Sequence, residues 1–99
     1  MSAELLFTPE SHQDVDDGFA WYERRRRGLG EEFMGSVADC IREICEHPEL
    51  RAKVVDEYRQ ANVRRFPYSV IYGYDGRYVT VYAITHNARD PQTWRRRLL

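Results

Sequence analysis

Three residues in the second half of the chain, Arg65, His86 and Arg89, have side chains that could carry out chemistry. Imidazole gains and loses a proton near neutral pH, so His86 is suited to act as a general base. The guanidinium groups of Arg65 and Arg89 could hold a phosphate and stabilise negative charge that develops on it. Such a set could support metal-free RNA cleavage, in which a base removes the 2′-hydroxyl proton and cations surround the phosphorane.

Each of these residues also has a structural interpretation. His86 could hydrogen-bond the end of a strand and hold the loop that follows, and this is the role that we expect for it. Arg65 could pair with an acidic residue of the helices. Arg89 could pair with Asp90 in a turn before Pro91 that directs the tail.

No metal site and no cofactor are predicted. A zinc site would need further ligands at the spacing of a zinc finger, and the sequence offers none. Cys40 and Cys45 lie five positions apart in a helical pattern, where their side chains diverge. We therefore expect no disulfide between them, which fits a reducing cytoplasm.

A β-hairpin is predicted between Arg65 and His86. Two segments rich in Tyr, Val and Ile, residues 68–72 and 78–84, are joined by Tyr74-Asp75-Gly76-Arg77. Asp-Gly supplies the positive φ angles of a two-residue type I′ turn, so Tyr74 should pair with Arg77. In that register Tyr72 faces Val79, Val70 faces Val81 and Tyr68 faces Ala83.

The predicted register gives the hairpin two different faces. One is a core face, made by Val70, Tyr72, Val79, Val81 and Ala83. The second carries Ser69, Ile71, Thr80 and Tyr82, with Tyr78 beside them. Exposed aromatic and aliphatic groups together often mark an interaction surface, so we expect the function on the second face.

Two helices are expected before the hairpin. Thr8 can cap the first helix, with Pro9 at its first position, and Arg24 to Arg27 end it before Gly28. The second helix starts at Glu31 and stops at His47-Pro48. The apolar residues that recur at helical spacing are Val15, Phe19 and Tyr22 in the first helix, and Phe33, Val37, Cys40, Ile41 and Ile44 in the second.

These elements combine into one α+β domain over residues 1–99. An N-terminal strand precedes an antiparallel helical hairpin, which packs on one face of a three- or four-stranded antiparallel sheet, and a short tail follows. Val54-Val55 could form a short strand and residues 60–66 another, with Pro67 at a bulge or an edge. By size scaling, the radius of gyration should be about 13 Å.

The net charge of −1 is divided unevenly along the chain. Residues 1–50 contain 12 acidic and 5 basic residues, a net charge of −7, whereas residues 51–99 contain 4 acidic and 10 basic residues, a net charge of +6. The basic half could bind phosphates or an acidic protein partner. The alternative is a solvated surface with ion pairs between the two halves.

No membrane partner is expected. No segment approaches the roughly 18 uninterrupted apolar residues of a membrane span, and the first residues lack the pattern of a signal peptide. We therefore expect a soluble protein in the cytoplasm.

Several segments, taken in order, resemble one family. They are Pro9 at a helix start, Phe19-Ala20-Trp21-Tyr22-Glu23, Gly28-Leu29-Gly30-Glu31-Glu32-Phe33, residues 64–72 with Arg-Phe-Pro-Tyr, and residues 83–91 with His-x-x-Arg-Asp-Pro, followed by Trp94. This order is similar to that of the ParE/RelE superfamily of bacterial type II toxins, nearer its ParE-like branch. The resemblance covers nearly the whole chain and implies a strand, two helices and an antiparallel sheet.

The resemblance implies a small cytoplasmic toxin that a cognate antitoxin neutralises by wrapping an extended segment or a helix around it. ParE-like members are described as poisoning DNA gyrase, whereas RelE-like members cleave mRNA in the ribosome. RelE-like proteins place one functional arginine where this chain has Ser69 and another where it has Arg89, so only the second matches. The tail also lacks the Tyr or His of those nucleases. We therefore expect a toxin that binds DNA gyrase; the alternatives are a ribosome-dependent endoribonuclease that uses Arg89, His86 and Arg65, and a non-toxic module that only binds the antitoxin.

A surface for the target or the antitoxin is expected on the second face and the tail. Trp94 should anchor the tail to the domain, and the basic residues after it should remain available for an anionic target, unless the tail is merely solvated. The residues expected to contribute to binding are Arg65, Tyr68, Ile71, Tyr78, Tyr82, Arg89, Trp94, Arg95, Arg96 and Arg97.

Overall fold

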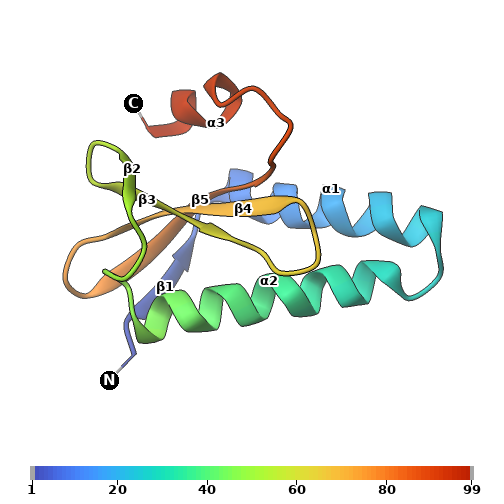
Figure 1. Cartoon of the computed structure of the whole chain (residues 1–99), viewed down its shortest axis with the longest axis horizontal. Helices are drawn as coiled ribbons and strands as arrows, with labels where there is room; N and C mark the ends of the chain where they lie inside the picture. Colours follow the sequence, from blue (N-terminus) through green and yellow to red (C-terminus); the bar gives the residue numbers. More distant parts are fainter. Residues whose placement is uncertain (1, 99) are drawn as a thin grey trace.

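The strands of the protein form one sheet, with two long helices against one face and a short helix over the other (Figure 1). The computed structural model describes residues 2–98. In chain order the elements are β1 (Glu4–Phe7), α1 (Pro9–Arg25), α2 (Leu29–Glu46), β2 (Lys53–Val55), β3 (Tyr58–Asn62), β4 (Tyr68–Tyr74), β5 (Tyr78–His86), α3 (Gln92–Arg95) and the 3₁₀ turn η1 (Arg96–Leu98). The α+β architecture predicted from the sequence is confirmed.

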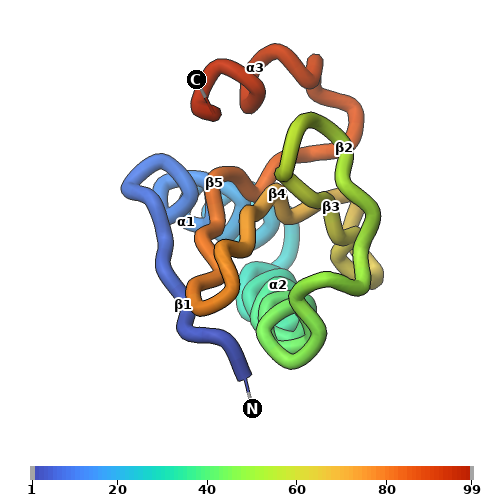
Figure 2. The backbone as a smooth tube through the Cα atoms, turned by 90° about the vertical axis from the view of Figure 1, so that its left-hand side faces the viewer, coloured from blue at the N-terminus to red at the C-terminus, as the bar shows by residue number. Residues whose placement is uncertain are grey.

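The sheet has five strands in the order β1-β5-β4-β3-β2. The four strands β2 to β5 pair antiparallel, as expected, and β1 adds to β5 in parallel. In Figure 2, α2 lies below the strands, α1 lies beside β5, and α3 lies above them. The Cα radius of gyration is 13.0 Å, in agreement with the size scaling.

The helical hairpin forms as its sequence predicts. The Thr8 hydroxyl accepts the Ser11 N–H at 3.1 Å, and Pro9 occupies the first turn of α1. Gly28 adopts a left-handed conformation with φ of 88°, which a residue without a Cβ reaches at little cost. The Glu23 carboxylate accepts the N–H groups of Gly28 and Gly30, so one side chain satisfies the amides that begin α2.

The main core lies between the helical hairpin and the sheet. Phe33 is fully buried and its ring meets those of Tyr22, Phe66 and Tyr68, with centroids 4.9 to 5.4 Å apart. A Cβ on Gly18 would lie 2.6 Å from the Phe33 ring, so the glycine lets α1 approach α2 closely. The buried members of this core are Phe33, Val37, Cys40, Ile41, Ile44, Cys45, Ala61, Val63, Phe66, Tyr68, Val70, Tyr72, Val79, Val81 and Ile84.

The turn between β4 and β5 lies one residue later than predicted. Its closing pair is Asp75 and Tyr78, and Gly76 has a positive φ of 98°, as the first central residue of a type I′ or type II′ turn requires. The Asp75 carboxylate accepts the amides of Arg77 and Tyr78 at 2.9 and 2.7 Å and so fixes this position. The predicted pairing of Tyr72 with Val79 is therefore wrong.

A bulge in β5 changes the predicted register again. Tyr72 pairs with Val81 but Ile71 pairs with Ala83, so Tyr82 is an extra residue. Val79 and Val81 face the helices as predicted, whereas Ala83 packs on the opposite side with Ile71. The assignment of Ala83 to the core face is wrong, and Ile84 takes that place.

The two cysteines are free, as expected, and both are buried. Within residues 2–98, no helix is long and apolar enough to cross a membrane. In the same part of the chain, no three His, Cys, Asp or Glu side chains gather closely enough to hold a metal ion.

Candidate interaction surface

The candidate site lies mainly on the outer face of the sheet, which is the face turned away from α1 and α2. It has three zones along the strands. The central zone holds Ile71 and Ala83, a polar zone surrounds Ser69, and a tyrosine groove contains Tyr78 and Tyr82. The residues predicted to form one continuous surface are thus divided.

The central zone is covered by the C-terminal tail. Trp94, 6% exposed, packs on Ile71 and Ala83, which are 0% and 1% exposed. The predicted role of Trp94 as an anchor is confirmed. The expectation that Ile71 is exposed is wrong, because the tail folds back over it.

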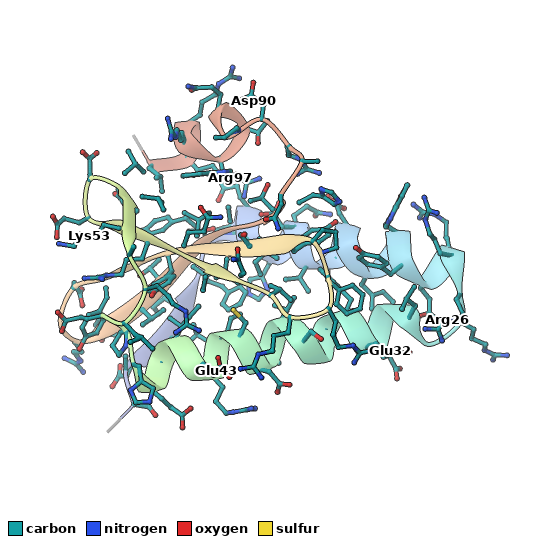
Figure 3. The ribbon with its side chains drawn as sticks, in the orientation of Figure 1. Arg26, Glu32, Glu43, Lys53, Asp90 and Arg97 are labelled. Carbon is teal, nitrogen blue, oxygen red and sulfur yellow. The ribbon has the colours of Figure 1, made fainter. Side chains whose placement is uncertain are left out.

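An ion pair fastens the end of the tail. The Arg97 guanidinium donates to both carboxylate oxygens of Asp14 on α1, at 2.6 and 3.1 Å, and to the Tyr82 carbonyl at 3.1 Å. Figure 3 shows Arg97 on the side of the tail that faces the sheet, whereas Asp90 points away. Hydrogen bonds from Arg97 to Asp14 raise the pKa of the guanidinium. Arg97 was predicted to be available for an anionic target, and that expectation is wrong because the residue is engaged within the chain.

Asp14 also completes the hydrogen bonding of β5. Its Oδ2 atom accepts the buried Ile84 N–H at 2.9 Å, at a point where β1 has already ended. A carboxylate of α1 thereby replaces a neighbouring strand. The signal in the sequence is the stripe Ser11, Asp14 and Gly18 on the buried side of α1. Small and polar residues at helical spacing indicate a close polar contact, and this contact was missed.

The polar zone is built around a buried hydroxyl. Ser69 is 0% exposed, and its Oγ atom lies within hydrogen-bond distance of Gln60, Asn62 and Asn87, at 3.0, 2.9 and 2.6 Å. Thr85 pairs with Ser69 across the strands, and its buried hydroxyl has no hydrogen-bond partner among residues 2–98. The polar zone around Ser69 therefore consists of neutral side chains.

His86 holds the loop after β5. Its Nδ1 atom accepts the Ala88 N–H at 3.0 Å, and its ring meets Tyr68 edge-on at 5.3 Å. The neighbouring Asn87 N–H donates to the Pro67 carbonyl. The predicted structural role of His86 is therefore confirmed, and one ring nitrogen is already engaged in it.

Arg65 and Arg89 lie in different surroundings. Arg65 has a left-handed φ of 70° and donates to Glu32 on α2 at 2.8 Å, as the structural interpretation predicted. Hydrogen bonds from Arg26 and Arg65 lower the pKa of Glu32. Arg89 instead lines a groove of about 320 Å³ beside α1, with Trp21 and Arg24 among its neighbours. Among residues 2–98 no ion pair or hydrogen bond joins the side chains of Arg65, His86 and Arg89.

Three arginines of the tail region remain exposed, namely Arg89, Arg95 and Arg96. None of them forms an ion pair with any residue of the described part of the chain. The predicted pair of Arg89 with Asp90 is absent there; the Asp90 carboxylate accepts the Gln92 N–H at 3.0 Å and so begins α3.

Tyr68, also predicted for binding, is buried between the helices and the sheet, and desolvation raises its pKa.

The tyrosine groove occupies the other end of the outer face. Tyr78 and Tyr82 line it together with Tyr58, whose ring meets Tyr82 edge-on at 5.4 Å. Tyr78 and Tyr82, which were predicted to contribute to binding, are half-buried and reachable from solvent. They are separated from the polar zone by Trp94 and the residues beneath it.

A second apolar surface, which the sequence reasoning missed, lies at the β1 edge of the sheet. The N–H groups of Glu4 and Thr8 donate to the carbonyls of Arg77 and Val81, so the alternate amides of Leu5 and Phe7 point away from β5. Leu5 and Leu6 are 43% and 47% exposed. Next to this edge, a groove of about 270 Å³ is lined by Phe7, His12, Val15, Asp16, Met34, Val37, Ala38 and Ile41.

The fold is similar to that of a solved chain described as "Chromosomal ParDE TA system from P. aeruginosa". The TM-score is 0.76 at 15% sequence identity, and the match covers 86% of this chain and 96% of that chain. At the level of sequence, no family model matches and no curated protein matches closely. The chain therefore has the fold of a component of a ParDE system, which confirms the resemblance to the ParE/RelE superfamily at the level of the fold.

Proposed function

We propose that the protein is the toxin of a bacterial type II toxin–antitoxin pair, which acts by binding DNA gyrase and is neutralised by a cognate antitoxin. The observation that carries this proposal is the structural similarity to a ParDE chain over nearly the full length of both proteins. The order of the sequence motifs supports the same assignment. Function on a shared scaffold depends on its sites, so the proposal also needs a surface for each partner.

Binding is favoured over RNA cleavage by the separation of the groups that cleavage would need. His86 Nδ1 accepts a backbone amide, Arg65 is paired with Glu32, and Ser69 lies in a neutral cluster. A general base and the cations that stabilise a phosphorane would have to converge within hydrogen-bond distance of one phosphate. The described residues offer no such convergence.

The surface proposed for gyrase is the set Arg89, Arg95 and Arg96. Trp94 and Arg97 fix the tail to the domain, so the two arginines between them are held on its exposed side. Unpaired arginines on an anchored backbone lose less entropy on binding a carboxylate or phosphate than those of a mobile tail. An anionic part of the target is thus the expected contact.

The surface proposed for the antitoxin is the β1 edge with the apolar groove beside it. An extended segment can add to an open strand edge through backbone hydrogen bonds and place apolar side chains in an adjacent groove. Leu5, Leu6 and Met34 are the exposed large apolar residues of this region. The exposed edge would otherwise favour aggregation.

Expression of the chain without its antitoxin in bacteria tests the function. We expect growth arrest with filamentation and a DNA-damage response, and inhibition of plasmid supercoiling by purified gyrase. Rapid loss of translation with cut transcripts would instead identify a nuclease, and normal growth would identify a non-toxic module. Either result contradicts the proposal.

Charge reversal tests the target surface. The double variant Arg95→Glu/Arg96→Glu should lower gyrase inhibition at least tenfold without changing the unfolding midpoint. The control Arg27→Glu/Arg42→Glu makes the same change in net charge at exposed positions of the helical hairpin and should retain inhibition. Equal loss in both variants would indicate non-specific attraction and exclude this surface.

A charge in the apolar groove tests the antitoxin surface. Met34→Glu should leave the chain toxic but prevent rescue by the product of the adjoining antitoxin gene. Gly35→Glu introduces the same charge at the next position of α2, where a Cβ meets nothing within 4 Å, and should still be rescued. Rescue of Met34→Glu would exclude the groove as the docking site.

A further inference from the structure

The tyrosine groove has the shape and the walls of a binding site. It measures about 360 Å³ and lies between the β2–β3 turn, the β4–β5 turn and the end of the tail. Its lining residues are Asp56, Glu57, Tyr58, Gly73, Tyr74, Asp75, Tyr78, Thr80, Tyr82 and Leu98. A Cβ on Gly73 would lie 3.4 Å from the Tyr82 ring and 3.5 Å from the Tyr58 ring, so both rings lie close over the backbone here.

The aromatic groups are available to a ligand. Among residues 2–98, the hydroxyls of Tyr58, Tyr78 and Tyr82 form no hydrogen bond, although the three side chains are only half-exposed. Arg77 lies over the Tyr78 ring, with its guanidinium carbon 5.0 Å from the ring centroid. This contact occupies one face of the Tyr78 ring within the chain, and it is an example of a planar cation stacked on a tyrosine of the groove.

The carboxylates of the groove give it a negative charge. Glu57 pairs with Lys53 at 2.8 Å, which leaves Asp56 and Asp75 without an ion-pair partner in the described part of the chain. Two further cations lie nearby: Arg77 pairs with Glu4 at 3.7 Å, and Arg59 donates to the carbonyls of Glu49 and Arg51. Hydrogen bonds from the Tyr78 and Arg77 amides lower the pKa of Asp75, so this carboxylate is ionised at neutral pH.

We infer that the tyrosine groove binds an arginine side chain of a protein partner. A guanidinium can stack on the tyrosine rings and donate in parallel to a carboxylate, whereas a lysine ammonium lacks the planar surface. The groove is open and too polar for a typical apolar small ligand, but an extended side chain fits it. This inference does not depend on toxicity or on the proposed gyrase and antitoxin surfaces, which lie elsewhere.

Amide NMR spectra of the ¹⁵N-labelled full chain, titrated with N-acetyl-arginine methylamide, test the inference. We expect saturable shifts confined to residues 56–58, 73–75 and 78–82. The citrulline analogue, which has the same shape without the charge, should bind at least tenfold more weakly. The lysine analogue should also bind more weakly. Shifts spread over the surface, or binding of either analogue as tight as that of the arginine probe, would overturn the inference.

Two variants make the test specific to the groove. Asp56 has a left-handed φ of 47°, which Asn adopts readily, so Asp56→Asn removes a charge without straining the turn. Tyr78→Leu removes a ring and keeps an apolar side chain. Each should weaken arginine binding at least fivefold, while Glu46→Gln at an exposed site on α2 should not. Unchanged affinity in both groove variants, with unfolding midpoints that match the parent, would refute the site.

Discussion

The two faces of the sheet are covered in different ways. The inner face packs against α1 and α2 through a continuous apolar core with Phe33 and Tyr72 at 0% exposure. The outer face is covered by one short tail, whose contacts are the Trp94 ring, the Arg97 ion pair and a few partly buried residues. The packing of α1 and α2 on the inner face depends on a large buried apolar area, whereas the packing of the tail on the outer face depends on a few directed contacts.

This difference separates the residues that stabilise the fold from the residues that are exposed for binding. Apolar burial is spread over many residues of the inner core, so the inner face should unfold only with the whole domain. The tail depends on a few residues, so it should open alone and at lower free energy. Exposed groups on the tail can therefore be altered without loss of the fold. The following variants test this comparison, from the largest effect to the smallest.

Phe33→Ala should have the largest effect, because it leaves a cavity at the centre of the inner core. The loss in free energy of unfolding should be about 3 to 5 kcal/mol, measured by urea denaturation. Met34→Ala, at the next and 44% exposed position, is the control and should change little. A loss below about 1 kcal/mol for Phe33→Ala would contradict the central role of this core.

Asp14→Ala should have the second largest effect, because it removes contacts both to β5 of the sheet and to the C-terminal tail. It leaves the Ile84 N–H without its acceptor and the Arg97 guanidinium without its partner. Removal of one member of a buried pair costs about 3 to 5 kcal/mol, and the 25% exposure of Arg97 favours the lower end. Asp17→Ala, at an exposed position of α1, should have no comparable effect in the same denaturation experiment.

Trp94→Ala should release the tail while the domain stays folded. We expect a loss of about 2 kcal/mol, below the range for a large aromatic residue in a closed core, because the tail can detach. Hydrogen exchange should accelerate at residues 92–98 and not in α2. Faster exchange throughout α2 would show that the two faces are not independent.

Alkaline pH should produce the smallest effect, and only above neutrality. Burial raises the pKa of Cys40 from 9.0 to about 11, and it also raises the pKa values of Cys45 and Tyr72. The folded state favours the neutral groups, so the contribution of Cys40 to stability is present below pH 9 and is lost as pH rises to about 11. The urea midpoint should fall over this range, and less steeply in Cys40→Ala. A midpoint that stays constant would contradict this assignment.

Much of the inner face was predictable because its signals are local. Thr8-Pro9 begins α1, and the apolar residues of α2 recur at helical spacing. The alternation of Val79 and Val81 likewise assigns the first half of β5 to the core. Each of these patterns is contained in a few neighbouring residues.

The outer face was less predictable because its contacts join distant parts of the chain. Asp14 and Arg97 are 83 positions apart, and nothing near either residue identifies the other. Ile71 is suited equally to an exposed patch and to a surface beneath a tail. The predicted binding roles of Arg89, Arg95 and Arg96 stay predictions, although their exposure is now known.

The bulge at Tyr82 has a consequence for how the hairpin can vary. The extra residue lets Tyr82 and Ala83 both face outward, so that Ala83 lies beneath Trp94 and Ile84 faces the helices. Removal of Tyr82 would restore regular alternation and keep Ala83 and Ile84 on their present sides, whereas removal of a residue elsewhere in β5 would turn side chains to the opposite face. We expect relatives with this arrangement to tolerate a change in the length of β5 at the bulge more readily than at its other positions.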